Sequence, residues 1–178
     1  ATGGIYDGRT ERVLLLLPNL GIHSDPRKGQ RFQHGRNLFV LKHEATHQLL
    51  DPWRDALPTW LDEGFSECIA AMPYVQGRYR FANLDAAMRD YLLKWQPSNS
   101  RTKLMVVPPD HLMSMTRRQW DDSVAEQSAY HLYNSAGLLA YYFLRHDGGG
   151  KSAGLAAYFD AVRRGVDPRD AEREHLLR

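Results

Sequence analysis

The sequence predicts a helix-dominated α+β fold with its strands near the N-terminus. Its 178 residues fit one domain, and 43% hydrophobic with 25% charged residues is an ordinary balance for a globular protein. Strand signals are confined to the first twenty residues, whereas apolar residues recur at helical spacing over much of the remainder. We therefore expect a single domain, 1–178, in which 1–75 hold a small sheet and two paired helices, and 76–178 form a helical lobe.

Residues 3–18 predict a β-hairpin. Asp7 and Gly8 form a turn pair suited to positive φ, with a strand on each side. The apolar run 13–17 is expected to be buried on both faces. The next segment, 19–36, is rich in glycine, charge and amide side chains and has no period, so we expect a surface loop there.

Several segments predict helices. The first runs from Asn37 to about Leu50 and repeats apolar residues at helical spacing. A second helix is expected to begin at Pro58, since proline favours the first helical turn. The repeating apolar residues of the first helix are Leu38, Leu41, Ala45 and Leu49, and further helices are predicted at 84–95, 111–115, 128–145, 153–164 and after the Asp167–Pro168 pair.

Composition excludes some classes of partner and site. A formal net charge of +2 gives no reason to expect nucleic acid, and the longest apolar run is too short to span a bilayer. The chain starts at Ala1 without a leader, so we expect a processed protein that acts outside the cytoplasm, whether secreted, periplasmic or surface-attached. Because Cys68 is the only cysteine, a metal site would need histidine and carboxylate ligands.

Residues 43–47 read His-Glu-Ala-Thr-His, a pattern with metal-ligand spacing. Helical residues four apart differ by about 40° around the axis and about 6 Å along it, so His43 and His47 can reach one ion. Glu44 lies about 100° away and can instead reach a water on the metal, as the general base does in H-E-x-x-H. The pentapeptide alone also fits two unrelated histidines on a solvated helix.

A glutamate from the next helix is the expected third ligand. The Gly-His continuation of metzincins is excluded, because Leu50 and Trp53 occupy those positions. Glu63 follows His47 after fifteen residues, which is enough for the chain to reverse and a second helix to pack alongside. Asp62 is an alternative ligand, although it points about 100° away from Glu63.

These segments resemble the gluzincin zinc metallopeptidases of the thermolysin-like peptidase MA clan. In that family a Trp-Leu-x-Glu-Gly segment presents the glutamate ligand, here Glu63. Four segments are also similar, in order, to the bacterial peptidase-MA-like group (the DUF1570 type): "GGIYDGRTERVLLLL", "HEATHQLL", "PTWLDEGFSE" and "YNSAGLLAYYFL". The resemblance covers most of the chain and implies a zincin-like core with Zn²⁺ in a cleft between sheet and helices.

Glu67 is a further candidate, four residues after Glu63 on the same helix face. A carboxylate there can turn toward the free ring N–H of a ligand histidine and fix its orientation. In gluzincins a carboxylate at this offset commonly plays that part.

The family also uses a tyrosine or histidine on a downstream helix to stabilise the tetrahedral oxyanion. Tyr130, His131 and Tyr133 are the candidates here. Tyr133 is preferred because the small residues at 135–137 would let its helix approach the metal. A purely structural role for these aromatic residues is equally open.

The resulting hypothesis is a zinc metallopeptidase that acts on a peptide or protein. Zinc would be held by His43, His47 and Glu63, with Glu44 activating the zinc-bound water. An endopeptidase is favoured, because the Gly-x-Met-Glu-Asn segment of clan aminopeptidases is missing. The alternative is a peptidase-like binding or scaffold domain that keeps zinc for stability and has little turnover.

Overall fold

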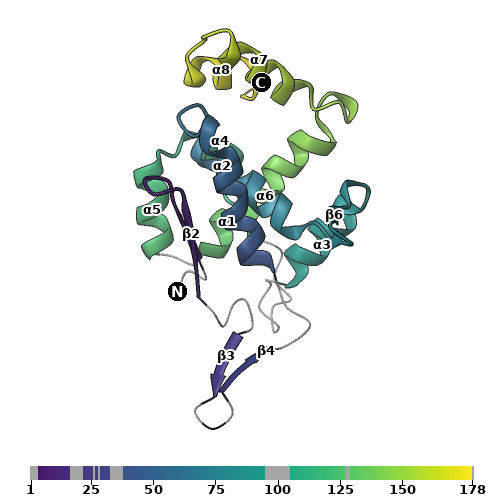
Figure 1. Ribbon diagram of the computed structural model, residues 1–178. Helices are drawn as coiled ribbons and strands as arrows, with labels where there is room; N and C mark the ends of the chain where they lie inside the picture. Colours follow the sequence, from purple (N-terminus) through teal and green to yellow (C-terminus); the bar gives the residue numbers. More distant parts are fainter. Residues whose placement is uncertain are drawn as a thin grey trace.

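The protein is helix-dominated, with short two-stranded antiparallel sheets, so the predicted α+β class with strands near the N-terminus is confirmed at this level. The computed structural model describes residues 4–16, 22–25, 27, 29–32, 38–94, 105–126 and 129–177. Figure 1 shows α1 and α2 in the middle of the molecule, the β1–β2 hairpin alongside them, and the α7–α8 pair at the far end from β3 and β4.

The predicted N-terminal hairpin is present as β1 (Gly4–Asp7) and β2 (Arg12–Leu15), with Ile5 paired to Leu14. The prediction that its apolar run is buried on both faces is wrong. Leu14 is 56% exposed and Leu16 57% exposed. The reason is that α1 packs on one face of this hairpin, so side chains that point the other way reach solvent.

The hairpin turn lies where the Asp-Gly pair predicted, but its geometry differs. The positive φ falls on Glu11 rather than on Gly8. The Asp7 carboxylate stabilises the turn by accepting hydrogen bonds from the Arg9 N–H (3.0 Å) and the Thr10 hydroxyl (2.9 Å). The guanidinium of Arg54 lies against Gly8, where an added side chain would require Arg54 to move aside.

The segment 19–36 is not the continuous loop that was predicted. It contains a second hairpin, β3 (Ile22–Asp25) paired with β4 (Gly29–Phe32). The remaining residues of this segment, apart from position 27, lie outside the described residues. Four-residue strands without clear alternation carry too weak a pattern for prediction.

The two predicted metal-bearing helices are α1 (Phe39–Leu50) and α2 (Thr59–Ala71), and they pack side by side. A short 3₁₀ turn, η2 (Asp51–Trp53), follows α1 at the Asp-Pro pair. Pro58 immediately precedes α2, and Asp62 in the first turn of α2 complements the positive end of the helix dipole.

The apolar repeat predicted the location of α1 but not its buried face. Leu49 is 76% exposed, and Leu38 and Leu41 are each more than a third exposed. The buried residues of α1 are Glu44 and Thr46. Helix α1 thus turns its two histidines toward α2 and Glu44 toward the N-terminal hairpin, while Leu50 packs against the core.

The other predicted helices are present, and a further helix and a pair of short strands were not predicted. Helix α8 is capped as expected, since the Asp167 side chain accepts a hydrogen bond from the Arg169 N–H at 2.9 Å. The additional elements are α5 (Arg117–Glu126), whose sequence is mostly polar, and the two-residue strands β5 (Tyr74–Val75) and β6 (Arg78–Tyr79). The remaining bounds are η3 (Phe81–Asn83), α3 (Leu84–Lys94), α4 (Pro109–Ser114), α6 (Ala129–Arg145), η4 (Asp147–Gly149), α7 (Ala153–Arg163) and α8 (Pro168–His175).

The core lies where α2 crosses α6. A side chain at Gly64 would collide with the carbonyl of Ala136, and one at Gly137 would lie 3.0 Å from Cβ of Glu67. Small residues on both helices therefore let the two backbones approach closely. Helix α6, from the C-terminal half of the chain, is thereby held against the helix that carries Glu63.

No helix in the described portions of the chain is both long enough and apolar enough to cross a membrane.

Candidate metal centre

Helices α1 and α2 bring together three side chains that can hold a metal ion. His43 and His47 lie one turn apart on α1, and Glu63 lies opposite them on α2. All three are largely buried, with side-chain exposures of 11%, 13% and 8%. These are the three ligands that the sequence predicted, and together they form a possible metal-binding triad.

The candidate ligand atoms form a compact triangle. Nε2 of His43 lies 3.1 Å from Nε2 of His47, and each nitrogen lies 3.5 Å from Oε2 of Glu63. A tetrahedral zinc ion with bonds of about 2.0–2.1 Å has its ligand atoms about 3.4 Å apart. The triangle is therefore the size of one face of a zinc coordination tetrahedron.

The far ring nitrogen of His47 is oriented by α2. Its Nδ1 lies 2.9 Å from Oδ1 of Asp62 and 3.3 Å from the hydroxyl of Ser66. Sequence analysis considered Asp62 only as an alternative ligand that points away from Glu63. It does point away, but toward the back of His47, where it can fix the ring with Nε2 facing the triangle.

The far ring nitrogen of His43 faces the predicted carboxylate. Nδ1 of His43 lies 3.0 Å from Oε1 of Glu67, within ion-pair distance but without the alignment of a full hydrogen bond. The other oxygen of Glu67 accepts a hydrogen bond from the hydroxyl of Tyr91 on α3. Each histidine of the triad thus has a carboxylate behind it, and the carboxylate behind His43 is itself held by a tyrosine.

The second oxygen of Glu63 is engaged by an arginine that sequence analysis missed. Arg117 Nη1 donates to Oε1 of Glu63 at 2.7 Å, and its Nη2 donates to Oδ2 of Asp62 at 2.7 Å. Arg117 begins α5, more than fifty residues away in sequence, and no local motif marks it. Only the packing of α5 against the site reveals this contact.

The electrostatic balance of the triad favours positive charge. Burial alone would lower the pKa of His43, but the carboxylates of Glu63 and Glu67 outweigh it and raise that pKa to about 10. Burial likewise opposes a charge on His47, whose pKa Asp62 and Glu63 raise to about 9. Burial would raise the pKa of Glu63, yet the two histidines hold it far below its usual range. A buried site with this bias suits a cation.

Glu44, the predicted base, lies between α1 and the N-terminal hairpin. It is only 8% exposed, and a Cβ on Gly4 of β1 would lie 3.0 Å from its Cγ. Burial raises its pKa, while the charges of the two histidines and a hydrogen bond from the Tyr6 backbone N–H oppose the rise. The carboxylate is thus held close to the triad but is not one of its three ligand groups.

Of the three oxyanion candidates, the structure places Tyr133 closest to the triad. Its ring contacts that of His43 edge-on, with centroids 5.9 Å apart, and packs against Trp120 at 5.5 Å. Burial and the nearby charge of Glu63 raise the pKa of Tyr133, so its hydroxyl stays protonated and can donate. Tyr130 is 51% exposed, and His131 lines a separate cavity with the 105–108 segment.

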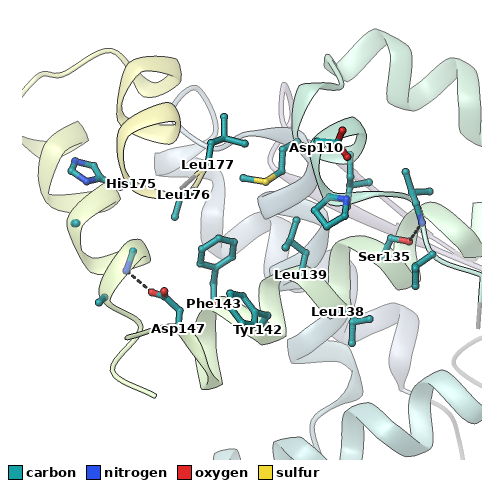
Figure 2. Close-up of a pocket in the computed structure, with 18 residues that line it drawn as sticks. Asp110, Ser135, Leu138, Leu139, Tyr142, Phe143, Asp147, His175, Leu176 and Leu177 are labelled. Carbon is teal, nitrogen blue, oxygen red and sulfur yellow. Dashed lines mark hydrogen bonds between the residues drawn. The ribbon is translucent and has the colours of Figure 1, made fainter. Parts of the chain in front are cut away.

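A cavity of about 870 Å³ lies elsewhere, between α6 and the α4, α7 and α8 helices. Figure 2 shows Leu138, Leu139 and Phe143 of α6 lining it together with Leu176 and Leu177. No member of the triad lines this apolar cavity. The volume of a cavity therefore does not by itself locate the candidate metal site of this protein.

Comparisons with protein-family models, curated proteins and solved structures find no match to this chain. The functional assignment therefore rests on the residues and their geometry.

Proposed function

We propose that this protein is a zinc-dependent metallopeptidase of the gluzincin type, with a zincin-like core. The observation that carries the proposal is the triangle of two imidazole nitrogens and one carboxylate oxygen, with edges of 3.1, 3.5 and 3.5 Å. Histidine and carboxylate are the ligand types of catalytic zinc sites, which use three protein ligands and keep a position open. When bound, zinc would polarise a substrate carbonyl and lower the pKa of a water molecule toward neutrality.

The chain's own residues would then divide the work. His43, His47 and Glu63 hold the metal, while Glu67 and Asp62 keep the two imidazoles oriented toward it. Glu44 lies beside the triad without belonging to it, and takes the proton of the attacking water before passing it to the leaving nitrogen.

Tyr133 is the proposed donor to the developing oxyanion. Its ring already contacts His43, and its hydroxyl remains protonated at neutral pH because burial raises its pKa. The substrate is a peptide or protein, and internal peptide bonds are the proposed target.

Metal content and hydrolysis measured on the same samples test this proposal. Purified protein should contain one zinc per chain by elemental analysis and should cleave members of a quenched fluorescent peptide library. Glu44→Gln should keep the zinc and lose turnover by about 10²- to 10⁴-fold, because it removes the base and leaves the ligands.

Two results would count against the enzyme. If wild type and Glu44→Gln bind stoichiometric zinc and are equally inert, the protein is better described as a zinc-stabilised binding domain. If elemental analysis finds no metal in the purified protein and chelator leaves the thermal midpoint unchanged, the metal centre itself is refuted.

A further inference from the structure

Arg117 joins two neighbouring carboxylates of α2 through the two terminal nitrogens of one guanidinium group. Nη1 donates to Glu63 and Nη2 to Asp62, both at 2.7 Å. The two acceptors are 8% and 14% exposed, so these charge-assisted hydrogen bonds are shielded from solvent on the acceptor side. A guanidinium is planar with fixed donors, and a lysine ammonium could not reproduce both bonds in this orientation.

The contact decides which oxygen of Glu63 faces the triad. Oε2 lies 3.5 Å from both histidine nitrogens, while Oε1 is held by Arg117 on the other side. A free carboxylate can ligate a cation through one oxygen or through both. With Oε1 engaged, Glu63 offers one oxygen, and the position a second oxygen would take is left for water or substrate.

The same guanidinium acts on His47 through Asp62. Oδ2 of Asp62 accepts from Arg117, and Oδ1 lies 2.9 Å from Nδ1 of His47. Arg117 therefore fixes one candidate ligand directly and the orientation of a second through one intermediate carboxylate. Arg117 also brings a positive charge to the neighbouring carboxylates of Asp62 and Glu63.

We propose that Arg117 is a positioning residue of the metal centre, which holds Glu63 as a one-oxygen ligand and Asp62 behind His47. The inference rests on the proposed function to the extent that the triad must bind a metal. It adds that coordination is controlled from α5, an element outside the two helices that supply the ligands.

Metal titration of Arg117→Gln tests the inference with Zn²⁺ and Co²⁺ as probes. Competition against a chromophoric chelator should give a zinc affinity about 10- to 100-fold weaker than that of wild type, the usual effect of losing a residue that orients a ligand. The visible spectrum of Co²⁺-loaded protein should also weaken, because a two-oxygen Glu63 raises the coordination number and tetrahedral Co²⁺ absorbs most strongly.

Arg118→Gln is the matched control, since Arg118 is the next residue of α5 and its side chain is 92% exposed. It should leave zinc affinity and the cobalt spectrum at wild-type values. Arg117→Lys should be intermediate in affinity, since it keeps the charge and loses the bridge. If Arg117→Gln does not fold, as judged by circular dichroism, Arg117→Lys decides the matter through the same two measurements.

The outcomes separate this inference from the proposed function. If wild type binds neither probe, the metal centre fails, and the inference fails with it. If wild type binds both and the Arg117 variants match it in affinity and cobalt spectrum, the metal centre stands and the role of Arg117 is only to link α5 to α2. A loss of thermal stability with unchanged coordination would also overturn the positioning role.

Discussion

Helices α1 and α2 both contribute to the candidate metal centre, but they bury opposite kinds of surface. In α2, large apolar residues such as Trp60 and Leu61 are fully buried together with Glu63 and Glu67. In α1 the buried residues are Glu44 and Thr46, and Leu49 is 76% exposed. Helix α2 is thus held by the apolar core, whereas α1 buries Glu44 against the hairpin, and its polar side with His43 and His47 faces the carboxylates of α2.

The largest expected effect comes from removing a ligand on the polar side of α1. His47→Ala should abolish stoichiometric zinc binding, with a loss of affinity greater than about 100-fold, because losing even a residue that orients a ligand costs about 10- to 100-fold. Elemental analysis and chelator competition would measure this. His111→Ala, at an exposed position on α4, is the control and should retain all its zinc. Full metal occupancy in His47→Ala would show that the polar side of α1 does not hold the ion.

Truncation of a leucine should destabilise the protein much more in α2 than in α1. Leu61→Ala in α2 should lower the free energy of unfolding by about 2–5 kcal/mol, because it opens a cavity in the core. Leu49→Ala in α1 should change it by less than about 0.5 kcal/mol, because that side chain is mostly in water. Urea denaturation of both variants gives the comparison. Equal losses at the two positions would mean that the apolar side of α1 is covered in solution.

Overpacking the crossing of α2 and α6 should have a smaller effect. Gly64→Ala places a methyl group against the carbonyl of Ala136 and should cost about 1–3 kcal/mol, despite the better helix propensity of alanine. Ala86→Ser adds one atom at an exposed position of α3 and serves as the control. A stabilised Gly64→Ala variant, seen as a higher thermal midpoint, would contradict the close approach of the two helices.

The smallest effect concerns the acid that anchors α8 to α2. Glu172 is 8% exposed and accepts a hydrogen bond from Trp60 Nε1 at 2.7 Å, and burial raises its pKa. Burial disfavours the charged form of Glu172 more in the fold than in the unfolded chain, so its contribution is present below the ordinary glutamate pKa and is lost as pH rises through the raised value.

Glu172→Gln should consequently gain stability relative to wild type as pH rises from about 4 to about 7, while its hydrogen bond to Trp60 is kept. Denaturation curves at both pH values would measure the gain. Glu174→Gln, at an exposed position of the same helix, should show no such trend. If the difference in free energy of unfolding between wild type and Glu172→Gln does not vary with pH, Glu172 does not have a raised pKa in the folded protein.

Short-range patterns in the sequence located most of the helices and the candidate ligand set. Spacing alone placed His43 and His47 on one helix side, and the turn after α1 placed Glu63 within reach of both. Glu67 was found because residues four apart share a helix face. Local rules were enough for these residues, since each depends on one helix or on two helices joined by a short turn.

Two features could not be predicted in this way, each for a physical reason. The apolar repeat of α1 does not mark its buried side, because Leu49 is 76% exposed, whereas Glu44 is buried against the hairpin and His47 faces α2. The angle between Asp62 and Glu63 on the helix showed only that both cannot easily be ligands. The contact of Asp62 with Nδ1 of His47 depends on how α1 packs against α2. The proposed zinc, peptidase activity and extracytoplasmic location remain predictions from the sequence.

The sequence by itself determined which residues can bind a metal, because ligand chemistry and helical spacing are local properties. Only the tertiary structure decided how those residues are oriented. Arg117 reaches Glu63 and Asp62 from a helix more than fifty residues away, and Tyr91 reaches Glu67 from α3. Such contacts depend on how separate helices pack around a shared core, and no pattern along the chain encodes that arrangement.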